Sequence, residues 1–234
     1  MIQVQNLSLF YEELQVLNAV HLTIKPGVIC GLAGINGAGK SSLINCLLGL
    51  ISEFEGQIFI NGHDVRKDRS WIKSHCGYAP EETELFDYLT GLEFLQLIAS
   101  VKRLSQPQKA IKSLSELFDM ADFLPMLIAG YSHGMRQKML LSAALMGEPD
   151  FIFIDEAING LDTLSLLRLK KYLQTLKGQG KTVVIASHVL PLLVDWCDEI
   201  LILHQGRLLK TLVRNEMQND DRSIEQIFME IIGQ

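Results

Sequence analysis

The sequence predicts an α/β fold in which a parallel sheet is preceded by antiparallel strands and interrupted by a block of helices. Three observations lead to this prediction. Short, fully apolar segments, typical of strands buried on both faces, alternate with segments of helical periodicity. Two loosely alternating segments precede the first of these strands. Between residues 82 and 145 the alternation stops, and helical patterns follow one another.

Length and composition favour one folded unit. The chain has 234 residues, of which 48% are hydrophobic and 21% charged, enough to bury a core without disulfides or metal. The net charge of −6 argues against a surface dedicated to nucleic-acid phosphates. The four cysteines form no C-x-x-C pair, so they are expected as buried thiols. We expect neither a secretory signal nor a membrane span, since no apolar segment approaches the roughly 18–20 residues that a span needs.

The first elements are predicted from alternation and from punctuation by glycine and proline. Strands are expected over residues 2–10 and 16–24, with a polar turn between them. The nearly unbroken apolar segment 28–33 predicts a buried strand. A glycine-rich loop follows over 34–39, and then apolar residues recur at helical spacing until Gly49. The order is therefore strand, glycine loop, helix.

The later elements continue this pattern. Strands are expected at 57–60, 151–154, 182–186 and 199–203, and helices within 90–124, around 135–144, over 166–178 and after Ser223. Pro107 suits the first turn of a helix, and Ser223 with Gln226 forms a capping box. We therefore expect a single domain with a core and β subdomain at 1–81 and 146–212, a helical subdomain at 82–145 and a tail helix at 213–234.

A phosphate-binding motif stands in the glycine-rich loop. Residues 34–41 fit G-x-x-x-x-G-K-[ST] in full, after a predicted buried strand and at the start of a helix. Glycines let backbone N–H groups curl around a phosphate, and the helix N-terminus favours the same anion. Lys40 would reach the β- and γ-phosphates, and the Ser41 hydroxyl would bind Mg²⁺. The expected nucleotide-binding residues of this loop are Gly34, Asn36, Gly37, Ala38, Gly39, Lys40, Ser41 and Ser42.

Two carboxylates follow the apolar strand 151–154. In a P-loop NTPase core, Asp155 lies beside the phosphate loop, where it can hold the hydration shell of Mg²⁺. Glu156 points elsewhere and could orient or deprotonate an attacking water. On their own these residues could simply be solvated acids at a strand end. Beside a phosphate loop the functional interpretation is favoured.

The next predicted strand ends at Ser187 and His188. Open α/β sheets bind their ligands at the carboxyl ends of their strands, which would bring His188 close to the phosphate. A lone histidine is more often a capping or core residue than a catalytic one, which weighs against this placement. The residues alone leave both interpretations open.

The order of these motifs resembles the nucleotide-binding subunit of ABC transporters, over residues 1–212. The shared motifs are the phosphate loop, the helical insert, Tyr131-Ser132-His133-Gly134-Met135, Ile154-Asp155-Glu156, Gly160-Leu161-Asp162 and Ser187-His188. The phosphate loop alone would indicate only an NTPase. The Ser-x-Gly signature upstream of Asp155 separates this family from kinases and GTPases.

The resemblance implies roles within one subunit. Tyr11 matches the aromatic residue that stacks on adenine, although an exposed tyrosine at a strand end is an alternative. Lys40 matches the catalytic phosphate-binding lysine, and Ser41 and Asp155 match the Mg²⁺ positions. Glu156 matches the catalytic carboxylate that polarises water.

Other matched residues imply a site shared between two subunits. His188 matches the histidine that contacts the γ-phosphate. Asp162 matches a loop that crosses to a second subunit. Ser132 and Gly134 match the signature, which in this family binds the γ-phosphate of the partner's ATP. The helix N-terminus at the signature would supply N–H dipoles to that nucleotide.

Three positions depart from the family pattern. His133 stands where the signature usually has glycine; it could weaken the nucleotide contact, make it depend on pH, or point away. Glu81 stands where glutamine is usual; a carboxylate cannot donate hydrogen bonds but can still serve Mg²⁺ or water, so Glu81 is kept as a nucleotide and metal residue. Ala157 replaces a common proline.

The resemblance implies an ATP-hydrolysing subunit with ATP and Mg²⁺ as its ligands. It would form a homodimer or heterodimer around two MgATP and drive a separate integral membrane permease, with export as the expected direction. It would lie peripherally at the cytoplasmic face, with the helical insert touching the permease near Glu81 and 82–87. No direct nucleic-acid partner is expected. The alternatives are a soluble ABC-type ATPase acting on ribosomes or DNA, and a module that binds ATP without turnover.

Overall fold

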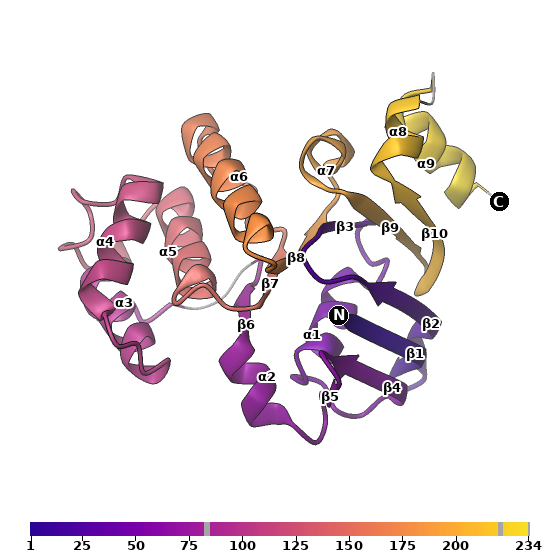
Figure 1. The fold of residues 1–234 in the computed structure, drawn as a ribbon, viewed down its shortest axis with the longest axis horizontal. Coiled ribbons are helices and arrows are strands. Elements are labelled where there is room, and N and C mark those ends of the chain that lie inside the picture. Colours follow the sequence, from indigo (N-terminus) through magenta and orange to yellow (C-terminus); the bar gives the residue numbers. More distant parts are fainter. Residues whose placement is uncertain (82–84, 220–221, 234) are drawn as a thin grey trace.

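The computed structural model describes residues 1–81, 85–219 and 222–233. Its main element is a six-stranded sheet with the order β10-β9-β3-β8-β7-β6 (Figure 1). The strands are β3 (Ile29–Ala33), β6 (Cys76–Ala79), β7 (Phe151–Asp155), β8 (Thr182–Ser187), β9 (Glu199–His204) and β10 (Arg207–Val213). All neighbours are parallel except β10, which runs antiparallel to β9. Five carboxyl ends therefore lie at one edge of the sheet, where open α/β sheets bind ligands.

A second, antiparallel sheet has the order β2-β1-β4-β5. Its strands are β1 (Ile2–Tyr11), β2 (Leu14–Ile24), β4 (Glu55–Ile60) and β5 (His63–Asp64). Helix α1 (Lys40–Leu47) buries Leu43, Ile44 and Leu47 in a core shared with both sheets. The N-terminus of α1 is thereby fixed at the carboxyl edge of the main sheet.

Helices α5 (His133–Leu145), α6 (Thr163–Gly178) and α7 (Leu190–Trp196) cover the other face of the main sheet. Helix α3 (Gly91–Val101) packs against α5, and α4 (Pro107–Phe118) packs against α5 and α6. Figure 1 shows α3, α4 and α5 gathered on the side of β6, away from the antiparallel sheet. The tail helix α9 (Ile224–Ile232) begins with the predicted capping box and buries Ile227 and Phe228 in the same core as α7.

The predicted fold class is confirmed, and the structure adds elements that the patterns did not predict. These are β5, β6, β10, α2 (Arg69–His75), the short 3₁₀ helix Ile128–Gly130, α7 and α8 (Arg214–Asn219). Strand β6 has four residues, one of them a glycine, so it has too little β-propensity to stand out. Most positions of β10 are not buried, so its sequence lacks an apolar run. The turn after β1 is also shorter than predicted, because Tyr11 already pairs with Leu14.

Residues 82–84, part of the segment expected to touch a permease, lie outside the described residues. Over the part of the chain that is described, no helix combines the length and apolar character needed to cross a membrane. The cysteines Cys30, Cys46, Cys76 and Cys197 are free and buried. The subdomain boundaries stay a prediction.

Candidate functional site

The phosphate loop connects β3 to α1 at the carboxyl edge of the main sheet. Gly39 has φ 102°, a backbone conformation that favours glycine, and it caps α1 without a side chain. Gly34 lies so close to the end of β9 that an added Cβ would come within 2.6 Å of the Leu203 carbonyl oxygen. The glycines of the motif therefore allow a tight loop that aims the N-terminus of α1 at a bound anion.

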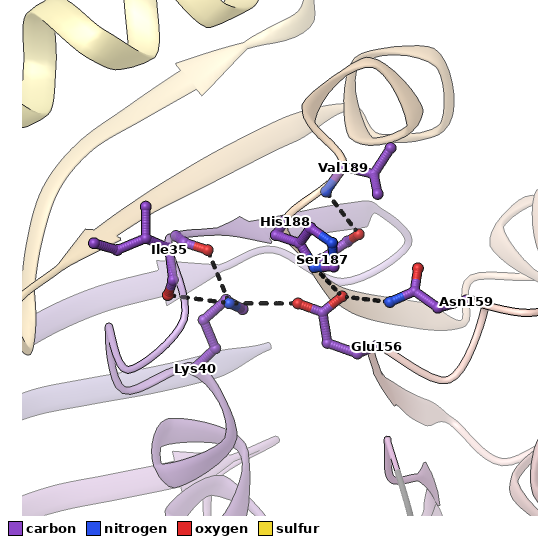
Figure 2. A network of polar contacts seen from close by, with 8 residues as sticks. Ile35, Lys40, Glu156, Asn159, Ser187, His188 and Val189 are labelled. Carbon is purple, nitrogen blue, oxygen red and sulfur yellow. Dashed lines mark hydrogen bonds and ion pairs between the residues drawn. The ribbon is translucent and has the colours of Figure 1, made fainter.

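Lys40 is buried, with 7% of its surface exposed. Its Nζ atom donates hydrogen bonds to the carbonyl oxygens of Gly34 (2.8 Å) and Ile35 (3.4 Å). It also lies 3.4 Å from Oε1 of Glu156 (Figure 2). The ammonium group is therefore held at the loop, next to the predicted catalytic carboxylate.

Glu156 stands at the centre of a polar network at the end of β7. Its Oε2 atom accepts a hydrogen bond from Asn159 Nδ2 (2.9 Å) and lies 3.0 Å from His188 Nδ1, as Figure 2 shows. The residue is 4% exposed and has φ 53°, a left-handed conformation that is costly for a non-glycine residue. Its backbone N–H donates to the Ala186 carbonyl oxygen (3.0 Å) on β8. The fold therefore fixes a strained, buried carboxylate between Lys40 and His188.

Asp155 provides an oxygen donor that fits a magnesium ion. It is 2% exposed, and its Oδ1 atom has no hydrogen-bond partner among the described residues. Burial raises the pKa of the Asp155 carboxyl, and the charges of Glu156 and Glu81 raise it further. A hydrogen bond with Ser41 and the charge of Lys40 lower this pKa and so oppose the rise. A cation beside Asp155 and Ser41 would satisfy this buried oxygen, and carboxylate and hydroxyl oxygens are the ligands Mg²⁺ prefers.

No group of three or more His, Cys, Asp or Glu residues within the described chain could hold a metal by itself.

A cleft of about 400 Å³ lies over the phosphate loop. Its lining consists of residues 36–42 together with Leu14, Val16, Glu81 and Glu156. Leu14 and Val16 on β2 were not predicted from the sequence, because no motif marks them. Tyr11, 47% exposed, pairs with Leu14 across the turn between β1 and β2 but is not part of the lining. The predicted adenine contact stays a prediction.

Glu81 lies exposed at this cleft, and its carbonyl oxygen accepts a hydrogen bond from Gln137 Nε2 (2.8 Å). Gln137 is 3% exposed and belongs to α5. This bond connects the cleft to the helix that starts at the signature. The sequence did not single out Gln137, since a buried glutamine in a helix has no motif of its own.

The signature residues lie outside the cleft of their own chain. Ser132 caps α5, its side chain accepting a hydrogen bond from the Met135 N–H (3.3 Å), and Gly134 lies in the first turn. Neither residue lines the cleft, and neither does Asp162. One chain therefore brings together Lys40, Ser41, Asp155, Glu156 and His188, but not the signature.

Asp162 caps α6 instead. Its carboxylate accepts hydrogen bonds from the N–H (2.8 Å) and hydroxyl (2.7 Å) of Ser165, and Lys138 Nζ lies at 2.9 Å. Hydrogen bonds from Ser165, with a smaller contribution from Lys138, hold the pKa of Asp162 well below its usual range.

We expect Asp162→Ala to lower the free energy of unfolding by about 1 kcal/mol at pH 7, as is usual for loss of a helix cap. Because the pKa is lowered in the folded state, the ionised cap stabilises the protein above the unfolded value of about 3.9. The difference between wild type and variant should therefore narrow as the pH falls below about 4. Urea unfolding at several pH values measures this. Asp162→Asn keeps a capping acceptor, so it should lower the free energy of unfolding by less than Asp162→Ala does. An equal decrease in the two variants would contradict the capping role.

Known proteins resemble this chain both in sequence and in structure. Residues 17–159 match a family model described as ABC transporter. The chain is 33% identical to the ABC-type transporter ATP-binding protein EcsA of Bacillus subtilis, over 99% of this chain and 96% of that protein. It is 32% identical to the ABC transporter ATP-binding protein NatA of the same organism, over 94% of this chain and 93% of that protein. A solved structure of the ATP-binding subunit of an ABC transporter superposes with a TM-score of 0.91 at 30% identity, covering 99% of both chains.

Proposed function

The chain belongs to the ABC transporter family as an ATP-binding subunit, and we propose that it hydrolyses ATP to drive a separate membrane permease. The observation that carries the proposal is the placement of Glu156. It is a buried carboxylate at the edge of a phosphate-loop cleft, bonded to His188 and Asn159 and next to the phosphate-binding lysine. A module that only binds ATP would not need this arrangement.

The residues of the cleft have separate tasks in this proposal. The loop N–H groups and Lys40 bind the phosphates of ATP, and Asp155 with Ser41 would hold Mg²⁺, which neutralises phosphate charge when bound. Glu156 orients a water for attack on the γ-phosphorus and accepts its proton, while ADP leaves. His188 supports the carboxylate of Glu156 and is expected to reach the γ-phosphate. Glu81 is expected to contact the metal ion or a water bound to it, and Tyr11 is expected to stack on the adenine base.

We propose that the site is completed by a second subunit, either an identical copy or a paralogue. Ser132 and Gly134 lie at the start of α5, outside the cleft of their own chain. Any nucleotide that these two residues contact would therefore have to be bound in the cleft of another chain. The positive end of α5 suits the γ-phosphate of that nucleotide. Asp162 already caps α6, so we expect its loop to approach the partner through its backbone.

The permease contact is proposed for the segment that leads into α3. Phe86 and Tyr88 are 44% and 75% exposed, and their rings lie 5.9 Å apart. Exposed aromatic side chains that adjoin one another mark protein contacts. We propose export as the direction, from the resemblance at Glu81 and the signature, and a peripheral place at the cytoplasmic face.

Purification of the tagged protein from native membranes under gentle conditions tests the transport proposal. We expect a polytopic membrane protein in stoichiometric amount. Tyr88→Ser should lower its recovery several-fold, because an aromatic anchor is lost. Met229→Ser on α9, a residue 63% exposed, serves as the matched control and should leave recovery unchanged. Ribosomal or DNA-associated partners without any membrane protein would contradict transport and favour the soluble ATPase.

A further inference from the structure

His133, the residue that departs from the family signature, packs against the loop that follows Glu156. A Cβ atom added to Gly160 would come within 2.7 Å of His133 Cδ2 and 3.1 Å of its Nε2. A Cβ added to Gly134 would come within 2.9 Å of the Gly160 carbonyl oxygen. Two consecutive residues at the start of α5 therefore lie against Gly160, and the imidazole does not point away.

Gly160 fits this contact because it has no side chain and because its φ of 89° favours glycine. Within the described chain, no hydrogen bond or ion pair holds the imidazole of His133. Its contact with Gly160 is thus a packing contact. The exposed imidazole of His133 packs against Gly160 and would therefore restrict the conformations available to residues 156–162.

The same loop is fixed at both of its ends. At the first end, Asn159 donates its side-chain amide to Glu156 Oε2 (2.9 Å) and its backbone N–H to the Glu156 carbonyl oxygen (3.0 Å). At the other end, Asp162 caps α6 and pairs with Lys138 of α5. Asn159 is the direct neighbour of Gly160. A change in the position of Gly160 therefore moves the amide that orients the Glu156 carboxylate.

We propose that His133 is a positioning residue that couples the signature helix to the catalytic carboxylate of its own chain, through Gly160 and Asn159. The proposal rests on the proposed ATPase function of Glu156.

A double-mutant cycle with His133→Ala and Asn159→Ala tests this coupling. Each single variant should lower kcat by about tenfold with KM for MgATP unchanged, less than the ~100-fold that a 1 Å misplacement can cost. The double variant should also lose about tenfold, because both changes break the same connection. Multiplicative losses, or a rise in KM at unchanged kcat, would overturn the proposal.

Two further variants separate packing from proton transfer or general damage. His133→Phe keeps a planar ring on Gly160. We therefore expect this variant to retain most of the wild-type kcat and to have an unchanged dependence of kcat on pH. His21→Ala removes an exposed histidine whose ring, among the described residues, bonds Asn6, and it should leave the kinetics unaltered. Loss of activity in His133→Phe equal to that in His133→Ala would contradict a packing role.

Hydrogen exchange of the nucleotide-free protein gives a readout that does not depend on turnover. We expect faster exchange of backbone amides in residues 156–162 in His133→Ala than in wild type. Unchanged exchange there would overturn the positioning role even if ATP is hydrolysed. Absence of hydrolysis in wild type, together with faster exchange in the variant, would instead contradict the proposed function alone.

Discussion

Glu156→Gln is expected to lower the ATPase rate at least ~100-fold, the lower range for loss of a general base, while MgATP stays bound. The amide has the same shape as the carboxylate and still offers an acceptor to Asn159, but it cannot take a proton from water. The substitution also removes the negative charge that lies 3.4 Å from Lys40 Nζ. The Lys40 ammonium is then free to bind phosphate. Phosphate release gives the rate, and equilibrium dialysis gives the affinity.

Glu148→Gln is the matched control for this variant. Glu148 also has a left-handed backbone, with φ 50°, but its side chain accepts a hydrogen bond from Tyr172, and neither residue lines the cleft. The change should therefore leave the ATPase rate unaltered. Full hydrolysis in Glu156→Gln would remove this residue from its assigned role.

Lys40→Ala is expected to weaken MgATP binding by roughly 100-fold, the effect of losing one or two charged hydrogen bonds of about 1.5–3 kcal/mol each. The lost group is the buried ammonium that lies between two loop carbonyls and Glu156. Hydrolysis should fall with it. Isothermal titration calorimetry measures the affinity directly.

Lys109→Ala removes one positive charge, as Lys40→Ala does, but from an exposed residue of α4. It should leave the affinity for MgATP unchanged. Retained tight MgATP binding in Lys40→Ala would contradict the assignment of the phosphate loop. The pair therefore separates loss of a specific phosphate contact from loss of overall positive charge.

The phosphate loop could be predicted from sequence because its residues are neighbours in the chain, and local geometry alone brings them together. Asp155, Glu156 and His188 could be placed at one edge because β7 and β8 are adjacent parallel strands. Asn159 could not be predicted, since its bond to Glu156 depends on the left-handed turn at Glu156. Leu14 and Val16 reach the cleft only through the packing of the antiparallel sheet beside α1.

The role of His133 also required the structure. From the sequence, a histidine in the signature could contact nucleotide or point away. Its packing on Gly160 depends on the approach of α5 to the loop after β7, which no local pattern encodes. The strands β6 and β10 were missed for a related reason, because their places in the sheet come from neighbouring strands rather than from strong apolar patterns of their own.

The most direct test of the account is the Mg²⁺-dependent release of phosphate from ATP as a function of protein concentration. If Glu156 acts in a site completed by the signature of a second subunit, the rate per chain should rise with concentration and then level off. Glu156→Gln should release almost no phosphate at any concentration. A rate per chain that does not depend on concentration, or one that Glu156→Gln leaves intact, would contradict the account.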